Sequence, residues 1–84
     1  MTTLRVQFFG RPSDIFGPGM DIDIPAAGVP LSELRRLLVQ SEPEASAVFE
    51  RYGVRAAVDA EISAEDVLVR PGQTVEFFSM FSGG

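Results

Sequence analysis

The sequence contains no cysteine and no histidine among its 84 residues. Without cysteine there can be no disulfide, no thiolate nucleophile and no thiolate ligand for a metal. Without histidine the chain also lacks the commonest general base and the commonest metal ligand of proteins. We therefore expect no metal site, no tightly bound cofactor and no catalytic activity from this chain alone.

Lysine is absent as well, because all seven basic residues are arginines. No side-chain amine is left to accept an isopeptide bond, so chains linked to one another in the manner of polyubiquitin are not expected. The net charge is -5, which argues against nucleic acid or an anionic membrane surface, since both are bound through lysine and arginine. A protein partner with a basic surface fits this charge better.

Long apolar runs are missing too. No segment approaches the ~20 apolar residues of a membrane span, and residues 1–5 do not form the apolar core of a signal peptide, so we expect a cytoplasmic protein. The length suits one small domain. We expect that domain to cover residues 1–78 and to be followed by a flexible tail over residues 79–84.

Two hydrophobic periods define the expected elements. Alternating apolar residues predict strands over 4–9, 20–24, 54–58 and 74–78, with a brief extended piece at Ile62. Apolar residues at helical spacing predict an amphipathic helix over 31–40 and a short second helix over 44–52. We expect a loop over 10–19 and an irregular connection over 64–69, with Leu68 as its anchor in the core.

Turn signals separate these elements. Gly53 suits a left-handed residue that ends the second helix. Asp59 begins a turn after the third strand, and we assign it no catalytic role. Pro71-Gly72 has the composition of a type II turn before the last strand.

The alternation also predicts an exposed apolar patch. If Phe8 and Phe77 face the helix, Phe9 and Phe78 face the uncovered side of the sheet, and contiguous exposed apolar area usually marks an interface. We expect Ile62, Met80 and Phe81 to extend this patch toward the tail. Two alternatives stay open: a loop covers Phe9, or the strands are shifted by one residue so that the other set is buried.

The chain ends on Ser82-Gly83-Gly84, directly after the apolar run. Glycine has no Cβ, so this tip can enter a narrow channel and its terminal carbonyl carbon is open to attack. An α-carboxylate has a pKa of roughly 3.5 and is ionised at neutral pH, so acyl transfer from it requires activation, which we expect a second protein to supply with ATP. The alternative is a frayed terminus or a cloning scar.

The last stretch reads GQTVEFFSMFSGG over residues 72–84. In this pattern the chain resembles the ubiquitin-like sulfur carriers, most closely the small subunit of molybdopterin synthase (MoaD-type). Ser79 and Met80 stand where that family has two prolines, and their presence predicts a looser tail. Asp59 stands where the family often has asparagine in a turn.

The resemblance implies an α+β fold of the β-grasp (ubiquitin-like) type. In this fold a mixed sheet of four to five strands wraps around one main helix, and here a short second helix is added. The first and last strands would lie side by side and parallel in the middle of the sheet. The periodicity alone predicts only an α+β domain with one covered sheet face.

The resemblance also implies a chemical role. An adenylating enzyme (MoeB-type) would use ATP to adenylate Gly84, and a sulfur donor protein would convert the adenylate to a thiocarboxylate. The tail would then insert into the large catalytic subunit of molybdopterin synthase (MoaE-type) and donate sulfur to a pterin precursor of the molybdenum cofactor. Gly83 would be the spacer beside the reacting residue, and the partner-binding residues would be Phe9, Ile62, Phe78, Met80, Phe81 and Ser82.

Three other functions remain open. A sulfur carrier could deliver sulfur to thiazole or another metabolite, although thiazole carriers tend to be shorter than this chain. A ubiquitin-like protein modifier would be joined to target lysines through the same glycine. A β-grasp interaction module would leave the tail inert.

Overall fold

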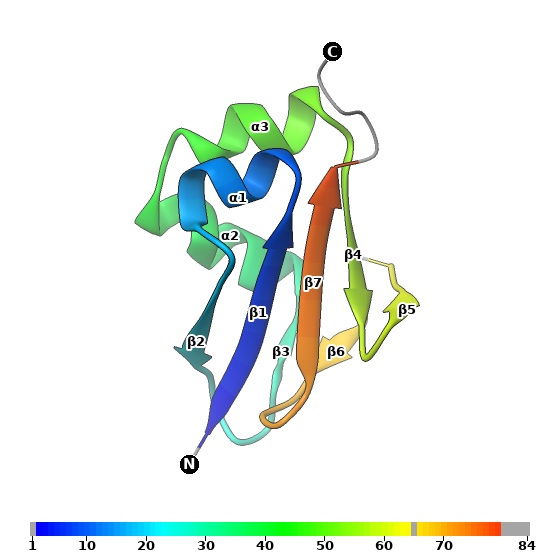
Figure 1. Cartoon of the computed structure of the whole chain (residues 1–84). Helices are drawn as coiled ribbons and strands as arrows, with labels where there is room; N and C mark the ends of the chain where they lie inside the picture. The colour runs from blue at the N-terminus through cyan, green and yellow to red at the C-terminus, as the bar shows by residue number, and fades with distance from the viewer. Residues whose placement is uncertain (1, 65, 80–84) are drawn as a thin grey trace.

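The computed structural model describes residues 2–64 and 66–79 (Figure 1). Within them the chain forms ten elements in the order β1 (Thr3–Phe9), α1 (Arg11–Phe16), β2 (Gly19–Asp23), β3 (Val29–Pro30), α2 (Leu31–Ser41), α3 (Ala45–Arg51), β4 (Val54–Val58), β5 (Glu61–Ile62), β6 (Leu68–Val69) and β7 (Thr74–Ser79). The predicted strands and both predicted helices are confirmed to within two residues at their ends. β7 includes Ser79, which we expected as the first residue of the tail.

Five strands form a mixed sheet in the order β2-β1-β7-β4-β5. The central pair, β1 and β7, is parallel, with Val6 opposite Val75 and Phe9 opposite Phe78. The other three pairings are antiparallel. The mixed five-stranded sheet with a parallel first and last strand at its centre is therefore confirmed.

The core lies between one face of this sheet and the helices. In Figure 1 the sheet faces the viewer and α2 lies behind it. The fully buried side chains come from alternate positions of the central strands and from the apolar stripe of α2, and include Leu4, Val6, Phe8, Leu31, Leu34, Leu38, Val75 and Phe77. Apolar residues at alternate positions of the strands and at helical spacing in α2 thus lie on the buried face of each element, and the other face of the sheet stays open.

The helix α1 corrects the expectation of a loop over 10–19. It begins at Arg11 with a proline in its first turn, a position where proline's missing N–H and fixed φ are tolerated. Phe16 stacks on Phe8 with 4.7 Å between ring centroids. Because a six-residue helix is marginal by itself, we attribute α1 to this packing and not to local propensity.

The connection after β5 also differs from the expectation. Val69 is fully buried, whereas Leu68 is 41% exposed, so Leu68 as the core anchor is wrong. β3 and β6 pair as a separate two-stranded sheet, with Val29 opposite Val69. Successive residues of a strand point to opposite sides, so a one-residue difference in register exchanges the buried residue.

The turns follow their sequence signals. Gly53 has φ 59 and follows Tyr52, the C-cap residue of α3, as expected for a left-handed helix end. Asp59 and Ala60 have φ 49 and 72 and form the two-residue turn between β4 and β5. Gly72 has φ 89 in the turn before β7, the conformation that a type II turn requires of its third residue.

The described residues contain neither a membrane-spanning helix nor a group of residues suited to bind a metal ion. None of the helices within 2–64 and 66–79 has the length and apolar character needed to cross a bilayer. The same residues contain no group of three or more carboxylates that could hold a metal ion.

Candidate functional site

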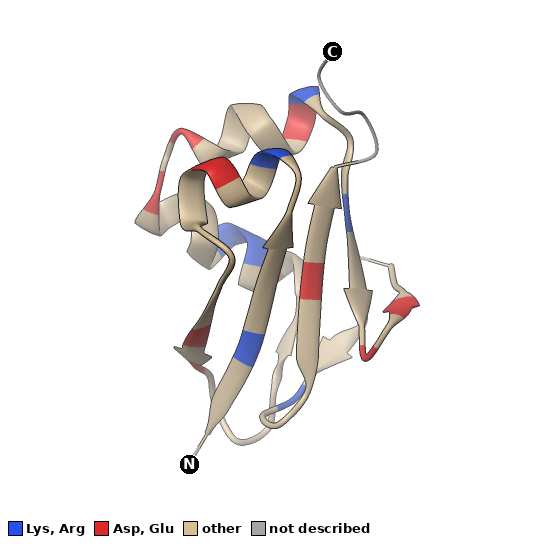
Figure 2. Ribbon diagram, in the orientation of Figure 1, with Lys and Arg blue, Asp and Glu red and all other residues tan. Residues whose placement is uncertain are grey.

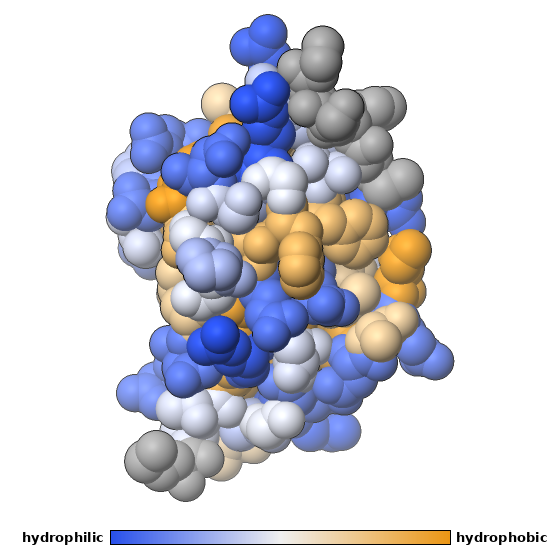
Figure 3. Space-filling view, viewed as in Figure 1, coloured by the Kyte–Doolittle hydropathy of each residue, from blue (hydrophilic) through white to orange (hydrophobic). Residues whose placement is uncertain are grey.

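The open face of the sheet carries the predicted apolar side chains. Phe9 is 48% exposed and Ile62 is 62% exposed, and Phe78 is half-buried beside Phe9. Among residues 2–64 and 66–79 no loop covers Phe9, and the register is the predicted one, so neither alternative holds for the described residues. Figure 3 shows apolar side chains gathered over β1 and β7 in the upper half of this face.

Ala57 lies on β4 between Glu76 of β7 and Ile62 of β5. It is 6% exposed but does not belong to the core cluster, unlike its neighbours Ala56 and Val58. Its backbone lies opposite Ile62 on β5, and the same strand places Arg55 opposite Phe78. We call Phe9, Phe78, Ala57 and Ile62 the open-face patch; sequence reasoning missed Ala57 because a small apolar residue gives no signal of its face.

Charged residues border the open-face patch. Arg55 lies beside Phe78 on β4, and Glu76 lies two residues before Phe78 on β7. Farther down the face, Arg5 donates a 3.4 Å hydrogen bond to Asp21, and both side chains are exposed. Figure 2 shows residues of both signs on the strands. An apolar centre with a mixed charged rim is the usual composition of a protein–protein interface.

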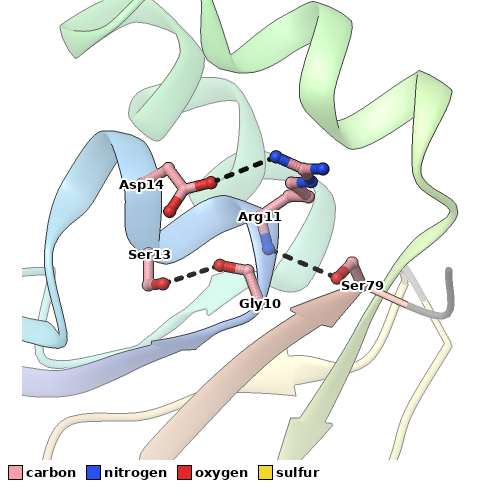
Figure 4. A network of polar contacts seen from close by, with 5 residues as sticks. All are labelled: Gly10, Arg11, Ser13, Asp14 and Ser79. Carbon is pink, nitrogen blue, oxygen red and sulfur yellow. Dashed lines mark hydrogen bonds and ion pairs between the residues drawn. The ribbon is translucent and has the colours of Figure 1, made fainter. Parts of the chain in front are cut away.

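The end of β7 is tied to the start of α1. The Ser79 hydroxyl accepts a 3.3 Å hydrogen bond from the backbone N–H of Arg11, in a partly buried position (Figure 4). This bond satisfies one of the first N–H groups of a helix, which have no partner within the helix. The last described residue before the predicted reactive tail is thus held by a contact that the sequence did not predict.

Gly10 makes room for this contact. A Cβ added to Gly10 would lie 2.3 Å from the Ser79 Oγ, and Gly10 has φ +70. The Gly10 carbonyl accepts two hydrogen bonds from Ser13, at 2.6 Å from the hydroxyl and 3.1 Å from the backbone N–H. Space and backbone conformation both call for glycine at this position.

Asp59 lies at the opposite end of β7. Its carboxylate accepts hydrogen bonds from the backbone N–H of Thr74 at 3.0 Å and from the Gln73 side-chain amide at 2.9 Å. These bonds, the first above all, hold the pKa of the Asp59 carboxyl below its ordinary value. Asp59 therefore joins the β4–β5 turn to the start of β7, which agrees with a structural role.

The remaining predicted site residues, Met80, Phe81, Ser82, Gly83 and Gly84, lie outside the described residues. The open-face patch and the Ser79 contact both lie where β7 leads into that segment. The structure therefore places Phe9 and Phe78 side by side near the end of β7, whereas Ile62 lies two strands away on β5, opposite Ala57.

Several solved structures share the fold of this chain. The putative molybdopterin converting factor subunit 1 from Pyrococcus furiosus is 19% identical, with a TM-score of 0.76 over 94% of this chain and 98% of that one. Small archaeal modifier protein 1 of Haloferax volcanii is 13% identical, with a TM-score of 0.74 over 94% and 98%. A chain in the complex of subunits 1 and 2 of molybdopterin-converting factor from Helicobacter pylori is 20% identical, with a TM-score of 0.63 over 98% and 99%.

At these identities the likeness establishes the fold and not the function. A search of curated proteins found no match. The model of the ThiS family, in contrast, matches residues 6–84, which is nearly the whole chain and includes both terminal glycines. The ubiquitin-like β-grasp fold predicted from the sequence is thus confirmed, and the chain belongs to the ThiS family of ubiquitin-like sulfur carriers.

Proposed function

We propose that this chain carries sulfur on Gly84 for molybdopterin formation, as the small subunit of a molybdopterin synthase. The observation that carries the proposal is the ThiS family match, which runs through Gly84. The neighbours named as molybdopterin-converting factor support the choice of pathway. The chain works only as a subunit in this proposal, because its 84 residues include no cysteine or histidine.

The proposed chemistry takes place on the carboxylate of Gly84. In a MoeB-type enzyme, a carboxylate oxygen attacks the α-phosphorus of ATP and pyrophosphate leaves, which converts a poor electrophile into a mixed anhydride. A hydrosulfide equivalent from a sulfur donor protein then attacks the carbonyl carbon, and AMP leaves with the electron pair of the C–O bond. The resulting thiocarboxylate sulfur is the nucleophile that reacts with the pterin precursor. ATP is consumed by the partner and is not a cofactor of this chain.

The open-face patch would dock on a MoaE-type subunit. The complex of subunits 1 and 2 in Helicobacter pylori supports a partner of this kind. Residues 80–84 can span at most about 17 Å when fully extended at about 3.4 Å per residue, which is enough to enter a neighbouring subunit. Gly83 and Gly84 would form the narrow tip, and Phe81 and Ser82 would contact the channel.

Docking must offset the ordering of this segment. Fixing five residues costs about 5 to 10 kcal/mol at roughly 1 to 2 kcal/mol each. Complete burial of a large apolar side chain contributes about 1.5 to 3 kcal/mol. Phe9 and Ile62 can contribute only part of this free energy on docking, because they are 48% and 62% exposed before docking. The patch alone therefore does not offset the ordering, and contacts of the tail inside the partner must contribute.

Two other functions use the same glycine. Likeness to small archaeal modifier protein 1 supports a protein modifier, in which a target lysine would attack the activated carbonyl. A carrier for thiazole or another metabolite would deliver the same thiocarboxylate sulfur to a different acceptor. An interaction module would need neither activation nor Gly84.

The intact mass of the chain tests the proposal. The chain is incubated with the activating enzyme of its own organism, ATP and a sulfur source. We expect a species that is heavier by the difference between one sulfur and one oxygen atom, and no such species when Gly84 is deleted. An unchanged mass, with the activating enzyme active on another carrier, would contradict every sulfur-carrier function. Transfer of the sulfur to a pterin by a MoaE-type subunit then separates the molybdopterin pathway from the others.

A further inference from the structure

We propose that Ser79 is a positioning residue for the reaction at Gly84. Its hydroxyl fixes the end of β7 against the start of α1 and thereby sets where residues 80–84 begin. The inference rests on the proposed function, because it assigns the hydroxyl a role in delivering Gly84 to a partner. It goes beyond that function because the role belongs to a side chain outside the reacting glycines.

The contact joins distant parts of the chain. Ser79 and Arg11 are 68 residues apart, and the bond from the Arg11 N–H to the Ser79 Oγ is 3.3 Å long and partly buried. Ser79 is the last residue of β7, and its backbone lies opposite Val54 at the start of β4. β4 and α1 thus hold Ser79 from two sides, one through the backbone and the other through the side chain.

The backbone at Gly10 and Arg11, which contacts the Ser79 hydroxyl, is held in place by other interactions. The carbonyl of Gly10 is fixed by two bonds from Ser13. Arg11 forms a 3.7 Å ion pair with Asp14 (Figure 4). Its guanidinium also lies 5.0 Å from the centre of the Tyr52 ring. The Arg11 backbone that donates to Ser79 is therefore anchored by α1 and by the residue that follows α3.

Gly10 is matched to the hydroxyl by shape. The 2.3 Å between a hypothetical Gly10 Cβ and the Ser79 Oγ is far less than any real contact of such atoms, whereas the Ser79 Cβ is 3.5 Å away. A Cβ at Gly10 would displace the hydroxyl, and the φ of +70 would strain any residue other than glycine at this position. Glycine at position 10 is therefore a condition for the Ser79 contact, and substitutions at Ser79 itself report on the hydroxyl.

The hydrogen bond of the Ser79 hydroxyl restricts the chain at a position where the resembling family has a proline. A proline at position 79 would restrict the chain by fixing φ near -65°. A side-chain bond to a fixed backbone restricts the same residue by a different means. We therefore revise, for position 79, the expectation that the missing prolines leave the root of the tail loose.

Steady-state kinetics of Gly84 activation test the role. We measure ATP-dependent acyl-adenylate formation by the cognate activating enzyme, with the full chain as the varied substrate. Ser79→Ala should lower kcat about twofold to tenfold, the range of one neutral hydrogen bond. KM should change less than kcat, because Ser79→Ala leaves the rest of the surface that the chain presents to the activating enzyme unchanged.

Two matched variants separate positioning from stability. Ser79→Thr keeps the hydroxyl and should retain the kcat of the wild type. Ser79→Val, which has nearly the shape of threonine but no hydroxyl, should lower kcat as Ser79→Ala does. The wild type and the three Ser79 variants are compared at a temperature at which circular dichroism shows each to be folded.

A measurement without any enzyme completes the test. Hydrogen exchange of the Arg11 amide should be faster in Ser79→Ala than in the wild type and in Ser79→Thr. An unchanged kcat and an unchanged Arg11 exchange rate in Ser79→Ala would each overturn the inference. A wild-type chain that is never adenylated would instead refute the proposed function, and the exchange rates would still decide whether the hydroxyl holds the end of β7.

Discussion

Phe8 and Phe9 are neighbours in the chain but face opposite sides of β1. Phe8 is 2% exposed and stacks on Phe16 and Phe77, whereas Phe9 is 48% exposed on the open face. Two adjacent phenylalanines therefore provide a matched pair, in which substitution of Phe8 tests the fold and substitution of Phe9 tests the proposed docking.

We expect Phe8→Ala to reduce the free energy of unfolding by about 3 to 5 kcal/mol, the usual result of removing a buried phenylalanine. Phe9→Ala should reduce it by less than about 1 kcal/mol. It should nevertheless weaken binding to the MoaE-type partner roughly tenfold, since aromatic anchors dominate interface energies. Urea unfolding and titration calorimetry measure the two quantities. Unchanged affinity in Phe9→Ala would refute the open-face patch as the docking surface.

The carboxyl of Asp59 makes stability depend on pH. Its pKa is lowered in the folded state by the bond from Thr74 and by the bond from Gln73. A lowered folded pKa stabilises the fold above the ordinary pKa of aspartate, near 3.9, and this stabilisation is lost as the pH falls through the folded value.

Asp59→Asn tests this dependence, because asparagine tolerates φ 49 but does not titrate. The difference in unfolding free energy between wild type and Asp59→Asn should stay constant from about pH 7 to 5 and change in favour of the variant below about pH 4. Glu33, whose pKa is lowered by its bond to Arg36, contributes equally to both proteins. A difference that is independent of pH would refute the assignment.

At the scale of elements, the hydrophobic periodicity of a segment determines whether the sequence can predict it as a helix or a strand. The strands and α2 were predicted because several turns or alternations repeat the same pattern. The helix α1 was not, because six residues after a glycine and before Gly17-Pro18-Gly19 carry too few repeats. Its proline in the first turn was the signal available.

The candidate site divides in the same way. Phe9 and Phe78 were predicted because alternation within a strand determines the face of each residue, whereas Ile62 was expected only as an apolar residue that extends the patch. The contact between Ser79 and Arg11 was not, because it depends on how β7 meets α1 across 68 residues of sequence. Local sequence patterns do not indicate which residues of distant elements come into contact. The side of Leu68 and Val69 was misassigned because two residues cannot show a period.

At the scale of the whole molecule, folding depends on β7. The strand pairs with both β1 and β4, and its Val75 and Phe77 are fully buried. The pairing of Arg5 with Thr74 joins the first strand to the last and so brings together residues that are far apart in the sequence. Strand β1 therefore lacks its neighbour at the centre of the sheet until β7 is present.

A deletion series tests this dependence. Removing residues 80–84 should leave the unfolding midpoint and the amide spectrum of residues 2–64 nearly unchanged, since this deletion removes no described contact. Removing residues 74–84 should abolish cooperative unfolding, because the centre of the sheet is lost. Circular dichroism and proton–nitrogen correlation spectra distinguish the two results. A cooperative transition in the shorter chain would contradict a central role for β7.

The parallel pairing of β1 and β7 also determines how the molecule can be handled. Because both strands run in the same direction, the start of β1 and the end of β7 lie at opposite ends of the sheet (Figure 1). A fluorophore or surface tether before Thr3 would sit about 23 Å from Ser79, the length of a seven-residue strand at about 3.3 Å per residue. The chain can therefore be immobilised before β1 while the end of β7 stays accessible to the proposed partner.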